Sequence, residues 1–145
     1  MKYILLIALM LTGVVYAQEG DKIKAFKRAH ITDALELTSG EAERFWPVYN
    51  AHEDKMTALR KKERREIFQI VKGDLNGISD EEANMLIEKS LQFKEKEMQE
   101  NRSFVSELKN VIPPQKILKL HRAEEEFKRM LLQRMKNRQN RRNKN

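Results

Sequence analysis

Residues 37–50 read LTSGEAERFWPVYN and join a helix start to the first apolar positions of a helix. Thr38 followed three residues later by Glu41 has the spacing of a capping box, in which each side chain accepts a hydrogen bond from the other residue's backbone N–H. A helix therefore begins at about Ser39. Apolar or semi-polar residues then recur at helical spacing, which predicts one long helix over 39–71. The expected buried stripe is Phe45, Val48 or Tyr49, His52, Met56, Leu59, Ile67 and Ile70.

Two local features should bend this long helix and end it. Pro47 removes one intrahelical hydrogen bond and crowds the preceding turn, so we expect a bend near residues 45–47. Residues 73–77 carry two glycines and an asparagine, which tolerate positive φ and end the helix in a turn.

The remaining segments carry the same helical pattern. A first helix is expected over 21–35, with Ile23, Phe26, Ala29 or His30, and Ala34 on one face.

Ser79 followed by Glu82 repeats the capping-box spacing and opens a third helix. Its expected buried stripe is Ala83, Leu86, Ile87, Ser90, Phe93, Phe104 and Leu108, thin enough between Phe93 and Phe104 to suggest a solvated stretch. Residues 111–115, with two prolines, start a fourth helix that runs to about Lys136. Its expected stripe is Ile117, Leu120, Ala123 or Glu124, Phe127, and Met130 or Leu131.

Composition supports this reading. Charged residues make up 35% of the chain and glycines and prolines are few, so we predict an all-α fold of four extended helices. Extended helices bury a thin core, which favours a dimer. We expect one helical domain over 18–136 and a disordered basic tail over 137–145, where no apolar residue occurs.

The N-terminus has the features of an export signal. Lys2, an apolar run over 4–15 and the small-x-small pattern Val15-Tyr16-Ala17 predict a signal peptide over 1–17, with an uncleaved anchor as the alternative. A periplasmic location follows. Without cysteine the chain has no lipid-anchor thiol, no disulfide and no thiolate metal site.

The net charge is +7, and removing residues 1–17 subtracts only Lys2, which leaves +6. Export excludes nucleic acid as the partner of this basic chain. Anionic lipid head groups, surface polysaccharide and acidic polypeptides remain, and the tail offers its charge to an anionic envelope surface.

Three motifs carry a resemblance to a known family. They are Leu37-Thr38-x-x-Glu41, the run FWPVYN over 45–50 and the run VIPPQ over 111–115. The chain resembles the LTxxQ, or Spy/CpxP-like, periplasmic proteins over most of its mature length. The runs over 41–50 and 123–129 resemble more narrowly the Bacteroidota branch labelled sensors of extracytoplasmic-function sigma factors.

The resemblance implies a hook-like antiparallel helical dimer that holds non-native proteins or modulates envelope-stress signalling. It also implies an alternative, a sensor in a sigma-factor or heavy-metal response pathway. Glu41 stands where the family has glutamine, and Val111 and Ile112 stand where its second motif has Leu-Thr. Because these motifs mainly start helices, they bear on architecture more directly than on activity.

No arrangement of nucleophile, base and orienting group is evident, so we expect no enzyme and no cofactor. The predicted binding surface for an unfolded or signalling polypeptide joins an aromatic cluster to a basic run, with core packing of the aromatics as the alternative. Its residues are Phe45, Trp46, Tyr49, Arg60, Lys61, Lys62, Arg64 and Arg65. We predict no metal site. The weak candidates are His52 and Met56, four residues apart, with His30 and His121 on other helices.

Overall fold

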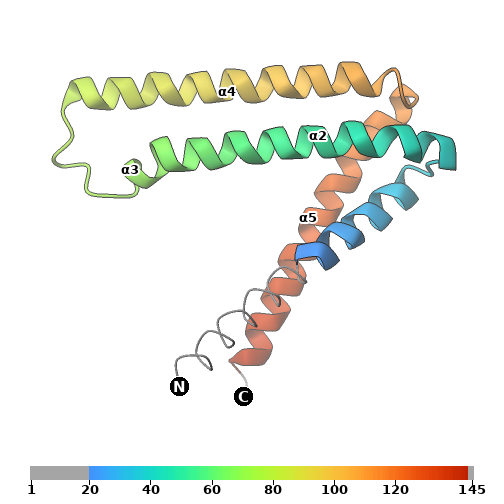
Figure 1. The fold of residues 1–145 in the computed structure, drawn as a ribbon. Coiled ribbons are helices and arrows are strands. Elements are labelled where there is room, and N and C mark those ends of the chain that lie inside the picture. Colours follow the sequence, from blue (N-terminus) through green and yellow to red (C-terminus); the bar gives the residue numbers. More distant parts are fainter. Residues whose placement is uncertain (1–19, 144–145) are drawn as a thin grey trace, which may run out of the picture. The chain divides into compact units, whose positions relative to one another are not determined.

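The computed structural model describes residues 20–143, and in that part of the chain every regular element is a helix. A first helix covers residues 20–34, followed by α2 (Ser39–Glu63), the π-helical segment η1 (Arg64–Phe68) and α3 (Gln69–Val71). Helices α4 (Asp80–Leu108) and α5 (Pro114–Arg142) complete the chain (Figure 1). The all-α prediction is confirmed, and the four helical runs begin and end within a few residues of the expected positions except at the C-terminus. The signal peptide predicted over 1–17 lies outside the described residues.

The chain forms two compact units. The first unit contains residues 20–37 together with residues 118–143, so that the helix over 20–34 packs on α5. The second unit covers Thr38–Ile117 and is built on α2 and α4, which lie side by side and antiparallel (Figure 1). The hook-like arrangement and the dimer remain predictions.

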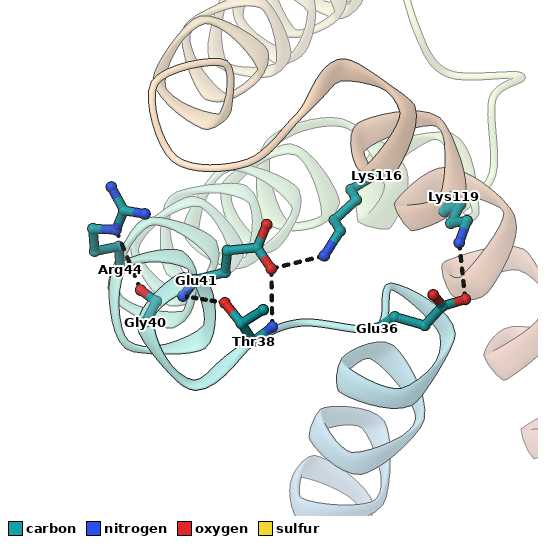
Figure 2. Close-up of polar contacts among 7 residues, drawn as sticks. All are labelled: Glu36, Thr38, Gly40, Glu41, Arg44, Lys116 and Lys119. Carbon is teal, nitrogen blue, oxygen red and sulfur yellow. Dashed lines mark hydrogen bonds and ion pairs between the residues drawn. The ribbon is translucent and has the colours of Figure 1, made fainter.

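Both capping boxes are present. Glu41 N–H donates to Thr38 Oγ1 at 3.3 Å, and Thr38 N–H donates to a Glu41 carboxylate oxygen at 2.9 Å (Figure 2). At the start of α4, Glu82 N–H donates to Ser79 Oγ at 3.2 Å, and Ser79 N–H donates back to the Glu82 carboxylate at 3.0 Å. The spacing of a hydroxyl and a carboxylate was therefore sufficient to place both helix starts.

The end of the first helix has a feature that the sequence did not indicate. Glu36 adopts φ 49°, the only positive φ of a non-glycine residue among the described residues. Leu37 N–H donates to Thr32 O and Glu36 N–H to Asp33 O, which is the hydrogen-bond pattern of a Schellman cap. A side chain in this left-handed conformation costs about 1–2 kcal/mol, and glycine usually stands there. In contrast, no described glycine has positive φ, so the turn over 73–77 forms without the conformation that we expected of its glycines.

Helix α2 continues as an α-helix through Pro47, which lies on the exposed side. The change from α-helical hydrogen bonding comes later, in η1, where Gln69 N–H donates to Arg64 O five residues back. Such π-turns accommodate one extra residue in a helix.

The C-terminal helix is longer than predicted. Helix α5 reaches Arg142, so residues 137–142 are helical where we predicted a disordered tail. Arginine and glutamine, four of these six residues, have high helix propensity, and extending an existing helix avoids the cost of nucleation. Lack of apolar residues therefore did not end the helix.

The core of each unit is small and apolar. In the unit of α2 and α4 the buried side chains are Phe45, Trp46, Tyr49, Met56, Phe93, Phe104, Leu108 and Ile112. In the other unit they are Ile31, Leu35, Leu120, Ala123 and Phe127. Three predicted stripe residues, Ile23, Ile70 and Ile87, are instead exposed.

Candidate functional site

The predicted aromatic cluster is part of the core. Phe45, Trp46 and Tyr49 are exposed by only 0%, 5% and 2%. Their ring centroids lie 5.0–5.4 Å apart, and Tyr49 also contacts Phe104 at 6.0 Å. At 100° per residue, positions i, i+1 and i+4 cover an arc of only about 100°, so one broad buried face accommodates all three. In the described chain these three side chains are therefore core residues, which is the alternative that the sequence left open.

The predicted basic run is exposed along its whole length, at Arg60, Lys61, Lys62, Arg64 and Arg65. Part of its charge is balanced by acids. Arg60 lies 3.9 Å from a Glu97 oxygen, while Lys62 and Arg65 lie 4.0 and 3.9 Å from Glu66. For Lys61 and Arg64 no ion pair is present among the described residues.

Ion pairs connect α2 and η1 to the middle of α4, the stretch that we expected to be solvated. Lys55 pairs with Glu100 at 3.4 Å and Glu63 with Lys94 at 3.6 Å. Lys89 lies 3.0 Å from Glu66, and its hydrogen bond is the main cause that lowers the pKa of Glu66. The thin apolar stripe of α4 is thus complemented by charge, and the middle of the helix lies along its neighbour.

Exposed apolar side chains gather where η1 and α3 lead into the turn. We call Phe68, Ile70, Val71 and Leu75 the tip cluster, and each is exposed by 44–51%. Lys72 Nζ lies 5.6 Å from the Phe68 ring centroid, within the range of a cation–π contact. Sequence periodicity missed this cluster because it predicted a buried stripe that continues to Ile70, whereas no residue of η1 or α3 is buried.

A second exposed stripe runs along the outer face of α4. We call Ile87, Leu91, Met98 and Val105 the α4 seam. Their spacings of four, seven and seven residues follow the heptad repeat of a helix that faces another helix. Lys94 and Asn101 occupy the remaining seam positions. Nothing in the described monomer covers this stripe, since its side chains are 38–60% exposed.

The candidate metal ligands have structural roles. His52 stacks on Phe104 at 4.0 Å with an interplanar angle of 2°, its Nδ1 is buried without a hydrogen-bond partner in the described structure, and burial lowers its pKa. Met56 is buried. His30 Nε2 lies 3.1 Å from Ala123 O in the other unit, and His121 is exposed. Within residues 20–143 no group of three or more His, Asp or Glu side chains is placed to hold a metal ion.

Two further findings bear on the class of protein. No helix within the described range is both long enough and apolar enough to cross a membrane. No protein-family model, curated protein or solved structure matches the chain. The resemblance to the Spy/CpxP-like proteins therefore stays a prediction.

Proposed function

We propose that this protein is an exported, non-catalytic binding protein of the Spy/CpxP type that holds non-native polypeptides at the tip cluster. The observation that carries the proposal is that four exposed apolar side chains follow the exposed basic run within ten residues of the chain. Contiguous exposed apolar residues are typical of interaction sites, and basic charge attracts acidic segments at longer range. The tip cluster takes the part that we first assigned to Phe45, Trp46 and Tyr49.

The test is whether the protein suppresses the aggregation of an unrelated denatured protein. Phe68→Ser should greatly reduce the suppression of aggregation. Leu118→Ser, which also removes an exposed apolar side chain but in the other unit, should leave it unchanged. Equal activity of the two variants would exclude the tip cluster. If the wild type suppresses nothing and instead binds one envelope signalling partner tightly, the sensor alternative replaces the chaperone.

We further propose that the protein acts as a homodimer in which two copies of α4 pack antiparallel along the α4 seam. One flank of the seam carries an exposed row at seven-residue spacing: Glu81, Glu88, Glu95, Arg102 and Lys109. The first part of the row is acidic and the last part is basic, so the row is complementary in charge to a second copy that runs in the opposite direction. Antiparallel packing places Glu81 opposite Lys109 and Glu88 opposite Arg102 of the second copy, and only Glu95 meets a like charge.

Sedimentation or light scattering tests this register by charge swapping. Glu88→Lys should weaken the dimer by placing two cations opposite each other, and adding Arg102→Glu to the same chain should restore it. A wild-type protein that stays monomeric at high concentration, or a double variant that is no better than the single one, would overturn the proposed interface. Because the swapped residues are exposed, neither change disturbs the core.

A further inference from the structure

We propose that the unit formed by the first helix and α5 binds a single-chain anionic amphiphile, such as a fatty acid or a lysophospholipid. The site is a groove between these two helices with a volume of about 520 Å³, within the usual range for small-molecule sites. Its apolar lining comes from Ile23 and Phe26 on the first helix and from Leu131 and Met135 on α5. Ile23 and Met135 are 44% and 66% exposed, so a bound acyl chain would cover them.

One end of the groove is closed by packing. Phe26 lies 5.4 Å from Phe127, which is buried, and His30 reaches the Ala123 carbonyl one turn beyond. The two helices are therefore in contact on that side of the groove. An acyl chain would lie with its tail toward Phe26, between the helices, and with its head group toward the later turns of α5.

Cations surround the open part of the groove. Its charged lining consists of Lys22, Arg134, Arg138 and Arg141, and none of the described residues that line it is acidic. The Arg134 guanidinium lies 4.3 Å from the Phe26 ring centroid, so charge and apolar surface meet in one place. A neutral or cationic amphiphile would gain the apolar contacts alone, whereas a carboxylate or phosphate would gain the cations as well.

The dimensions favour one acyl chain over a polypeptide helix. From Leu131 to Arg141 the groove follows α5 for roughly 15 Å, at 1.5 Å per residue. A helix is about 10–12 Å wide with its side chains, so a segment of this length fills roughly 1,000 Å³ or more, about twice the volume of the groove. A single chain with a charged head group fits both the length and the distribution of charge.

Calorimetric titration of the protein with laurate, below the micelle concentration of laurate, tests this site. We expect saturable binding that becomes about fourfold tighter for each added methylene between decanoate and myristate, as burial of a methylene predicts. Dodecanol and dodecyltrimethylammonium should bind at least tenfold more weakly. Comparison of laurate with lauroyl lysophosphatidylglycerol distinguishes a free fatty acid from a lipid head group as the natural source.

Two variants on the same helix locate the site. Met135→Glu places a carboxylate in the groove and should weaken laurate binding at least tenfold, whereas Leu132→Glu, at an exposed position outside the groove, should not. Affinity that is independent of chain length, or equal for the two variants, would overturn the proposal. Phe68→Ser should leave laurate binding intact, so the outcome is separate from that of the polypeptide assay.

Discussion

The two ends of the α2–α4 pair are held together by different interactions. We call the end near Thr38 and Leu108 the closed end, because its contacts are apolar: Phe45, Tyr49 and Phe104 are buried against one another. We call the end beyond Glu63, which includes the turn between α3 and α4, the open end. There, ion pairs link the helices and the apolar side chains face outward. The difference shows that one helical hairpin can concentrate its stability at one end and leave the other for recognition, since regions with few buried contacts open most readily.

Phe104→Ala should have the largest effect on this contrast. The side chain is buried between Tyr49 and His52, so its removal leaves a cavity and should lower the free energy of unfolding by about 3–5 kcal/mol. Phe68→Ala, the matched change at the open end, should cost under about 0.5 kcal/mol because the ring is half exposed. Urea denaturation monitored by circular dichroism measures both. Similar losses for the two variants would mean that the open end contributes as much to stability as the closed end.

The two capping boxes allow the next comparison. Thr38→Ala should lower the free energy of unfolding by about 1 kcal/mol, as loss of a helix cap usually does. Its partner Glu41 also accepts a 2.7 Å hydrogen bond from Lys116, so this box is tied to the start of α5 within the closed end (Figure 2). Ser79→Ala removes an equivalent cap at the open end, where we expect the loss to appear mainly as faster hydrogen exchange in the first turn of α4. If Ser79→Ala lowers the global stability as much as Thr38→Ala, the two ends unfold as one.

How far the sequence predicted the fold depended on the kind of signal. Hydroxyl and carboxylate spacing located both capped helices, and periodicity found most of the core, including Phe93, Phe104 and Phe127. The misses have physical causes. The π-turn at η1 has no sequence signature, and the buried stripe that we predicted as far as Ile70 does not continue into η1 and α3. Glu36 occupies a left-handed cap position where the sequence offers no glycine or asparagine.

The candidate site was harder to predict than the fold. Exposure of Arg60–Arg65 followed from its charge, whereas Phe45, Trp46 and Tyr49, the apolar half of the predicted surface, are buried in the core. Aromatic clusters occur both in cores and at interfaces, and composition does not distinguish the two. Of the α4 seam, Ile87 was predicted in the core, and Met98 lies in the stretch that we expected to be solvated.

His52 lies between the two ends, and its titration should make the stability of the protein depend on pH. Burial lowers its pKa below the ordinary 6.5, so the folded state binds fewer protons than the unfolded chain between that lowered value and pH 6.5. The stability that this difference provides is present above pH 6.5 and is lost as the pH falls through the lowered pKa. His52→Phe should keep the stack on Phe104 and flatten the dependence of stability on pH between 7 and 5. The exposed His121→Gln serves as the control for removal of an imidazole.

Neutralising Glu66 should have the smallest effect on stability, although this carboxylate contacts more cations than any other at the open end. The hydrogen bond from Lys89 lowers its pKa, so its contribution is present above its ordinary value of 4.5 and is lost as the pH falls through the lowered pKa. Because the group is close to solvent, screening limits that contribution. Glu66→Gln should therefore lower the urea midpoint only slightly at pH 7, and by less in high salt. Asp54→Asn, on the exposed side of α2, is the control for removal of a carboxylate charge. A shift as large as that of Thr38→Ala would show that charge stabilises the open end as strongly as capping stabilises the closed one.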